Sequence, residues 1–159
     1  MKLEQTNRII IKIGSALLFN ETSGSLNKEW LNSLAEDVKY LRENDKEVII
    51  VSSGAIAMGA KDLDLDMKNM KMDMNQAVSA VGQIHLMGSF KSAFEKNEIK
   101  ISQILLTLDD TEQRRRSINA RRTIDTLLKL GIVPVVNEND TIATSEIRYG
   151  DNDRLASRV

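Results

Sequence analysis

Four short apolar runs limit most strongly what this 159-residue chain can fold into. The runs lie at residues 8–13, 47–51, 99–106 and 132–136. Segments in which apolar residues recur at helical spacing separate them, at residues 27–44, 55–63, 74–96 and 109–130. Continuous apolar runs between helices are typical of a parallel sheet that is covered on both faces. The sequence therefore predicts an α/β fold, a three-layer αβα sandwich around a mainly parallel sheet.

Several details of these elements can also be predicted. Pro134 cannot donate a hydrogen bond to a neighbouring strand, so we expect the fourth strand to be bent or partly unpaired on one side. Asp109 or Asp110 is expected to cap one continuous helix up to Leu130, and residues 144–149 could form one arm of a hairpin. The long helix is expected to bury an apolar stripe made of Ala77, Ala80, Val81, Ile84, Met87 and Phe94.

The charge balance argues against recruitment by nucleic acid or an anionic membrane. Lys and Arg together number 22, Asp and Glu number 23, and the net charge is −1. The arginines of 114–116 and 121–122 form the only basic cluster, which favours a solvated face or a subunit contact, with an RNA-binding helix as the alternative. Without cysteine and with His85 as the single histidine, neither a thiolate nor a histidine-based metal site is expected. No apolar signal or membrane-spanning run is present in this sequence, so cytoplasmic localisation is the expectation.

The first candidate site is the turn that ends the first apolar run, Lys12-Ile13-Gly14-Ser15. Glycine lets backbone N–H groups approach phosphate oxygens, and an ammonium group neutralises their charge. The chain has neither a Walker A motif nor a Gly-x-Gly-x-x-Gly motif, so P-loop and classical dinucleotide-binding folds are not supported. The alternative is a lysine that extends from the sheet into solvent.

A second turn, Ser52-Ser53-Gly54, lies between the second apolar run and a predicted helix. Its hydroxyl and N–H groups suit an anion at a positive helix terminus, whereas the alternative is N-capping by serine. Two such turns after two strands, one of them preceded by lysine, indicate a double anion site.

Polar residues follow the fourth apolar run and recur ten residues later, in the segments 137–141 and 150–153. In an open α/β sheet, ligands bind outside the carboxyl ends of the strands. Asn139, Asp140 and Asn152 could hold the ammonium and carboxylate groups of an amino acid by amide and acid hydrogen bonds, and Asp153 could orient Lys12. For Asn137 and Asp151, an Asx turn or a helix cap is the favoured interpretation.

Taken together, these residues resemble the amino acid kinase family, and within it the branch that phosphorylates glutamate. The resemblance extends from Arg8 to Val159. It rests on motifs that keep the family's order and approximate spacing: Lys12-Ile-Gly-Ser15, Val51-Ser-Ser-Gly-Ala-Ile56, Ala80-Val-Gly-Gln83, Leu105-Leu-Thr107, Asn119-Ala-Arg121, Val133-Pro-Val-Val-Asn-Glu-Asn-Asp140 and Gly150-Asp-Asn-Asp153. The Asn-Glu-Asn-Asp and Gly-Asp-Asn-Asp pair is specific to the glutamate branch, whereas the lysine-glycine turn is shared across the family.

The resemblance implies the amino acid kinase fold and transfer of the ATP γ-phosphoryl group to the side-chain carboxylate of glutamate. This reaction gives glutamyl 5-phosphate, the first step of proline biosynthesis. Carried over by position, Lys12 would contact the nucleotide phosphates, with Gly14, Ser15 and Gly54 around them. Mg²⁺ would accompany the phosphates, with few dedicated protein ligands.

For the acceptor, the resemblance implies that Ser53, Asp140 and Asn152 bind L-glutamate and that Asp153 organises the catalytic lysines. It also implies a homo-oligomer and proline as a feedback inhibitor.

The resemblance further implies that residues 1–159 are the N-terminal, glutamate-binding part of a kinase domain that is incomplete at its C-terminus. Most of the nucleotide pocket, a second catalytic lysine and any RNA-binding-like C-terminal domain would lie beyond Val159. Expressed alone, such a fragment is expected to be inactive. The alternatives are a non-catalytic amino-acid-binding or regulatory module, and an acetylglutamate or aspartate kinase.

Overall fold

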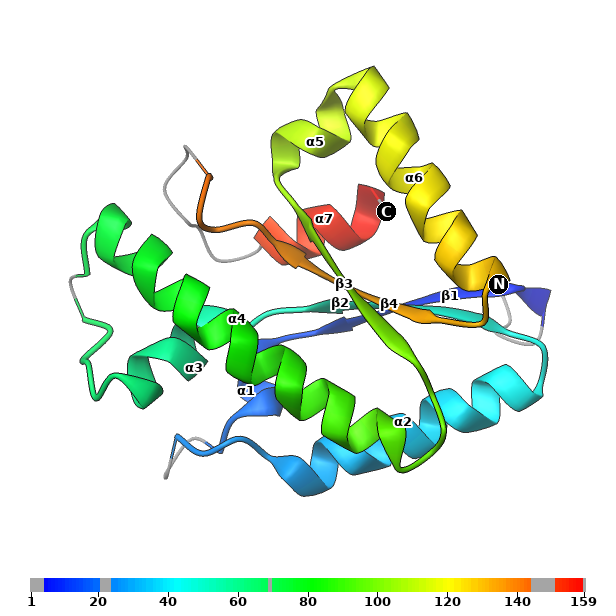
Figure 1. Ribbon diagram of the computed structural model, residues 1–159, viewed down its shortest axis with the longest axis horizontal. Helices are drawn as coiled ribbons and strands as arrows, with labels where there is room; N and C mark the ends of the chain where they lie inside the picture. Colours follow the sequence, from blue (N-terminus) through cyan, green and yellow to red (C-terminus); the bar gives the residue numbers. More distant parts are fainter. Residues whose placement is uncertain (1–4, 21–23, 69, 144–150, 159) are drawn as a thin grey trace.

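A parallel four-stranded sheet forms the centre of the structure (Figure 1). The computed structural model describes residues 5–20, 24–68, 70–143 and 151–158. The sheet has the order β1-β2-β4-β3, and every neighbouring pair is parallel. Its strands are β1 (Arg8–Ile13), β2 (Glu47–Ser52), β3 (Ile101–Leu106) and β4 (Val133–Glu138).

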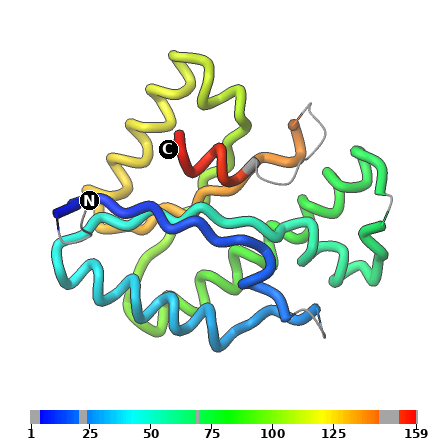
Figure 2. Tube along the Cα trace, turned by 180° about the vertical axis from the view of Figure 1, so that it is seen from behind, coloured from blue at the N-terminus to red at the C-terminus, as the bar shows by residue number. Residues whose placement is uncertain are grey.

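Helices cover both faces of this sheet, as Figures 1 and 2 show from opposite sides. The helices are α1 (Ser15–Leu18), α2 (Lys28–Glu43), α3 (Ala55–Asp62), α4 (Met72–Glu95), α5 (Leu108–Glu112), α6 (Arg114–Lys129) and α7 (Asp151–Arg158). Helices α2 and α4 lie on one face, whereas α5, α6 and α7 lie on the other. The predicted three-layer αβα arrangement is confirmed.

Two separate cores follow from the alternation of side chains along the strands. On β2, Val48 and Ile50 point into the core beneath α2 and α4, which contains Phe90 of α4. Ile49 and Val51 point to the opposite side, where Ile124 of α6 and Leu155 of α7 complete a smaller core. Because both faces are apolar, β2 reads as an unbroken hydrophobic run in the sequence.

Pro134 is accommodated because one side of β4 is only briefly paired. The amide of Val133 donates to the carbonyl of Lys100 on the β3 side, so the next residue along the strand turns its missing N–H toward β2. Pairing between β2 and β4 is confined to Val135 and Val136. The expectation of a strand that is partly unpaired on one side is therefore confirmed, although β4 lies in the interior of the sheet.

The predicted apolar stripe of α4 is wrong for half of its residues. Ala77, Ala80 and Ile84 face outward, and Ile84 is 74 % exposed. The buried face instead includes polar side chains that donate hydrogen bonds to, or accept them from, residues elsewhere in the fold. One example is Gln83, whose Oε1 accepts a hydrogen bond of 3.1 Å from Gln103 Nε2 on β3. The buried residues of α4 are Val78, Ser79, Gly82, Gln83, Leu86, Phe90, Ala93 and Phe94.

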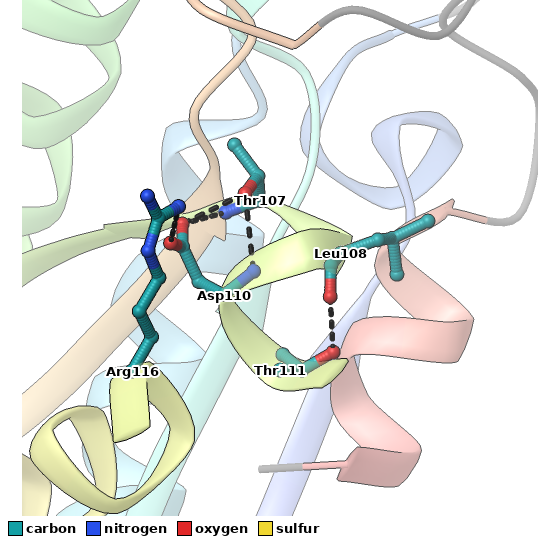
Figure 3. Close-up of polar contacts among 5 residues, drawn as sticks. All are labelled: Thr107, Leu108, Asp110, Thr111 and Arg116. Atoms are coloured by element: carbon teal, nitrogen blue, oxygen red, sulfur yellow. Dashed lines mark hydrogen bonds and ion pairs between the residues drawn. The ribbon is translucent and has the colours of Figure 1, made fainter. Parts of the chain in front are cut away.

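The helix expected over residues 109–130 is divided into α5 and α6 by Gln113, whose backbone is extended. The cap is Thr107, and neither Asp109 nor Asp110 takes that position. Thr107 and Asp110 form a reciprocal capping box, in which the Thr107 amide donates to Asp110 Oδ2 at 2.8 Å (Figure 3). Arg116, at the start of α6, donates to Asp110 Oδ1 at 3.0 Å and so connects the two helices.

The carboxyl ends of β1, β2 and β4 meet at one edge of the sheet, on the left in Figure 1. Strand β4 extends through Glu138, so Asn137 lies in the strand. The sequence had suggested that Asn137 lies in the loop after the strand. The final helix begins at Asp151 as predicted. The hairpin arm expected at 144–149 lies outside the described residues. None of the described helices combines the length and the apolar character that crossing a membrane requires.

Candidate active site at the carboxyl edge of the sheet

Lys12 is the penultimate residue of β1 and turns its ammonium group toward the glycine turn that follows. A Cβ atom built on Gly14 would lie 3.7 Å from Lys12 Nζ. The same ammonium forms an ion pair of 2.8 Å with Asp153 Oδ1 of α7. The side chains are 34 % and 62 % exposed, so the pair contributes little to stability. It does hold a positive charge above the turn that Gly14 and Ser15 form between β1 and α1.

The second glycine turn follows the neighbouring strand, β2. Gly54 is the N-cap residue of α3, and its φ of +101° is a conformation that other residues adopt at a cost. A Cβ atom at this position would also lie 2.7 Å from the ring of Phe19. Because glycine occupies the N-cap, serine does not cap α3 with its side chain: the Ser52 hydroxyl donates to the Ser53 carbonyl at 3.2 Å.

Asp140 follows β4, the next strand in the sheet, and is almost completely buried. Its Oδ2 accepts a hydrogen bond of 2.5 Å from the hydroxyl of Ser79 on α4. The neighbouring Asn139 is fixed by its amide, which donates to the Leu106 carbonyl at the end of β3. The Asn139 side chain accepts from the Thr141 hydroxyl at 2.5 Å and so closes the turn on itself.

Two amide side chains at this edge each have one buried atom without a hydrogen-bond partner among the described residues. They are Nδ2 of Asn137, a donor, and Oδ1 of Asn152, an acceptor. The Oδ1 of Asn137 accepts from the amide of the adjacent residue, Glu138, at 2.9 Å within β4. The Asx turn expected from the sequence, which would bond the amide two residues on, is not formed, because the Asn139 amide donates to Leu106. A buried polar atom without a partner is costly unless a ligand or water satisfies it. Asn137 is thus a candidate ligand-binding residue that the sequence analysis missed, because a local turn was the favoured interpretation there. Its burial at the end of β4 is the feature that indicates a role in binding.

The predicted site residues therefore occupy one continuous region of the fold. Three adjacent strands deliver the two glycine turns and the 137–140 segment, and α7 adds Asn152 and Asp153. Other candidates lie elsewhere. His85 pairs with Asp62 at 3.2 Å on the helices beside the sheet, and Arg116 is committed to Asp110. A cavity of about 510 Å³ lies between α2 and α4, and none of the predicted site residues lines it.

The carboxylates of Asp140 and Asp153 could hold a magnesium ion only together with other ligands, such as phosphate oxygens and water. Asp153 is paired with Lys12 and Asp140 with Ser79, so neither carboxylate stands in a ready-made cage. Throughout the described part of the chain, no three acidic or histidine side chains gather into a metal-binding group. Magnesium commonly binds through substrate phosphates and water, with one or two carboxylates.

Comparison with known proteins relates the chain to one family. Residues 7–159 match the amino acid kinase family. Glutamate 5-kinase of Pelagibacter ubique (strain HTCC1062) is 60 % identical over 159 residues, which are all of this chain and 43 % of that protein. Glutamate 5-kinase 1 of Mesorhizobium japonicum is 56 % identical over 157 residues, 99 % of this chain and 41 % of that protein. The chain thus spans less than half of the curated relatives that it matches.

The solved structures agree with the fold. The product complex of isopentenyl phosphate kinase from T. acidophilum superimposes with a TM-score of 0.54 at 13 % identity. The match covers 82 % of this chain and 54 % of that one. At this identity the likeness concerns the fold alone.

Proposed function

The chain belongs to the amino acid kinase family, and from this premise we propose that it is the glutamate-binding part of a glutamate 5-kinase. The reaction would transfer the γ-phosphoryl group of ATP to the side-chain carboxylate of L-glutamate and give glutamyl 5-phosphate. The observation that carries the proposal is the position of the Lys12–Asp153 ion pair at the same sheet edge as the buried side chains of Asp140 and Asn137. The names of the relatives support the choice of glutamate.

Recognition of the amino acid follows from the hydrogen-bonding character of the buried groups. We assign the α-ammonium group of glutamate to the carboxylate of Asp140 and the Oδ1 of Asn152, which are both acceptors. The Nδ2 of Asn137 is a donor and suits the α-carboxylate. With its α-ammonium and α-carboxylate groups held in this way, glutamate would direct its side chain toward Ser53 and the turns that follow β1 and β2.

Phosphoryl transfer requires positioning and charge neutralisation more than a covalent side chain. Lys12 supplies a positive charge next to the Gly14 turn, where it would stabilise the transferring group as negative charge shifts between oxygens. The N–H groups around Gly14, Ser15 and Gly54 would contact the phosphate oxygens, and Asp153 would keep the lysine in place. Mg²⁺, bound mainly by the phosphates, would supply further charge neutralisation.

The remaining parts of the proposal concern the longer protein. Since the chain spans 43 % of its Pelagibacter relative, we place most of the nucleotide pocket in sequence outside residues 1–159. The longer protein would catalyse the first step of proline biosynthesis in the cytoplasm, as a homo-oligomer that proline inhibits.

The experiment measures glutamyl phosphate, trapped as its hydroxamate, from the longer protein that carries these residues. We expect turnover that requires both ATP and L-glutamate, with acetylglutamate and aspartate as poor substrates. The matched pair is Asp140→Asn, which should raise the glutamate KM at least about tenfold, and Asp109→Asn, an exposed carboxylate outside the site that should change nothing. Turnover with aspartate or acetylglutamate in place of glutamate, or a D140N variant with an unchanged KM, would contradict the proposal.

A further inference from the structure

The buried hydroxyl of Ser79 makes a long-range hydrogen bond to the carboxylate of Asp140. Ser79 lies on α4, is 0 % exposed, and donates to Asp140 Oδ2 across 61 residues of sequence. Asp140 itself is 7 % exposed. A hydrogen bond from a hydroxyl to a carboxylate is short and strong when both groups are removed from water. The bond therefore restrains the direction in which this carboxylate faces.

A second contact from the same helix fixes the chain just beyond Asp140. The Nε2 of Gln76, one turn before Ser79, donates to the carbonyl of Ala143 at 3.0 Å. On the other side of the segment, the amide of Asn139 is bonded to Leu106 of β3. The 139–143 segment is thus held between β3 and the first half of α4.

Helix α4 is in turn held tightly against α3. A Cβ atom on Gly82 would lie 1.8 Å from the Ala55 carbonyl oxygen, and one on Gly59 would lie 1.9 Å from the Val78 carbonyl oxygen. The two helices therefore cross in backbone contact, as the neighbouring ribbons of α3 and α4 in Figure 1 indicate. Helix α3 begins directly after Gly54, and α4 contacts both α3 and, through Ser79, the Asp140 carboxylate. The position of α4 therefore fixes the position of Asp140 relative to the Ser53-Gly54 turn.

We propose that Ser79 is a positioning residue for the glutamate site: it orients the Asp140 carboxylate toward the substrate ammonium group while α4 holds that carboxylate in register with the Ser53-Gly54 turn. This inference rests on the proposed function for its substrate. Ser79 does not contact the reacting atoms, so its removal should weaken binding of the amino acid and leave the nucleotide site intact.

The test compares Ser79→Ala with Ser89→Ala in the longer protein. Both changes remove one hydroxyl from α4, but the Ser89 hydroxyl donates to the His85 carbonyl of its own helix. We expect S79A to raise the glutamate KM about tenfold, the factor typical for loss of a hydrogen bond to a charged group. In S79A the KM for ATP should stay within about twofold of the wild type, and the melting temperature should fall by only a few degrees, because one buried hydrogen bond is lost. All parameters of S89A should stay within about twofold or two degrees of the wild type.

Two kinetic results would overturn the proposal. One is an unchanged glutamate KM in S79A. The other is a parallel rise in the KM values of glutamate and ATP, since a general loss of structure would produce it. A crystal structure of the S79A variant gives a readout that is independent of turnover. We expect the Asp140 carboxylate to rotate away from its present direction, and an unchanged carboxylate would also overturn the proposal. If the wild type fails to phosphorylate glutamate while Asp140 rotates in S79A, the proposed function fails and the positioning role stands.

Discussion

At the scale of single residues, the Lys12–Asp153 ion pair contributes little to the stability of the fold. Both side chains are substantially exposed, and exposed ion pairs typically contribute no more than about 1 kcal/mol to folding. A lysine beside a glycine turn at the carboxyl edge of a parallel sheet is, in contrast, well placed to neutralise phosphate charge. We therefore propose that the ammonium group of this pair serves phosphate binding, and that its contribution to folding is small.

Replacing Lys12 tests this explanation. We expect Lys12→Ala in the longer protein to lower kcat by roughly 100-fold or more, a loss typical for removal of one group that stabilises transition-state charge. Glutamate affinity, measured by calorimetry, should be nearly unchanged. Lys91→Ala is the control, because Lys91 forms a comparable exposed ion pair with Glu95 on α4. If K12A retained its turnover, the role assigned to Lys12 would be wrong.

At the scale of elements, the Asp110 carboxylate connects the start of α5 to the start of α6 through Thr107 and Arg116. Partial burial opposes ionisation, but hydrogen bonds from the Thr107 backbone and hydroxyl and from Arg116 favour the carboxylate and prevail. The pKa of Asp110 therefore lies below its ordinary value of 3.8. Because the folded pKa is the lower one, this stabilisation is complete above the unfolded pKa and is lost as the pH falls through the folded pKa.

Asp110→Asn should consequently lower the free energy of unfolding by about 1 kcal/mol at neutral pH. Below the folded pKa of Asp110 the wild type and the variant should become equally stable, since both then carry a neutral side chain. Urea denaturation across this pH range measures the difference. Asp109→Asn, in the same turn of α5 but exposed, should change stability by less than about 0.5 kcal/mol. A D110N difference that persisted undiminished in acid would exclude this electrostatic explanation.

The crossing of α3 and α4 gives a second prediction for an element, because two glycines of one helix have opposite roles. A Cβ atom on Gly82 would meet backbone atoms of α3, whereas one on Gly88 would meet no atom within 4 Å. We expect Gly82→Ala to destabilise the protein by at least about 2 kcal/mol through forced separation of the helices. Gly88→Ala should instead stabilise it by about 0.5–1 kcal/mol, the usual gain of alanine over glycine within a helix. Thermal unfolding of both variants checks the signs, and a harmless G82A would contradict the observed crossing.

At the scale of the whole molecule, the order of the strands assembles the candidate site. Strands β1, β2 and β4 are neighbours although β3 comes between β2 and β4 in sequence. The 137–140 segment therefore lies next to the Ser53-Gly54 turn, and the Lys12 turn lies on the far side of that turn. Within the described chain β1 is an edge strand, and Ile10 on it is 39 % exposed.

This arrangement leads to a prediction for the 159-residue chain on its own. All the residues that we assign to glutamate binding lie on this chain. The residues that we assign to phosphate binding are limited to Lys12 and the two glycine turns. We expect the isolated chain to bind glutamate in calorimetry and to give no hydroxamate with ATP. The D140N variant of the isolated chain should lose the binding. Robust turnover by the isolated chain would refute the division of the site, and an absence of glutamate binding would show that the acceptor site needs the remaining sequence.

Much of the fold was predictable from the sequence because its determinants are local and repetitive. Residues 48–51 of β2 are apolar on both faces, so the sequence alone indicates a buried parallel strand without knowledge of the neighbouring strands. Parallel strands place their carboxyl ends at one edge, which is why Lys12, Ser53 and Asp140 could be assigned to one region in advance. The sequence by itself determined the layers, the sheet and the edge at which polar residues collect.

Only the tertiary structure decided which polar groups are buried and with which partners. The inward face of α4 could not be recognised from its periodicity, because it includes the polar residues Ser79 and Gln83, whose partners Asp140 and Gln103 lie far along the chain. Asn137 likewise appeared to be a local turn until the length of β4 placed it inside the sheet. The cost of burying a polar atom depends on a partner that lies far along the chain, and no local pattern of residues contains that information.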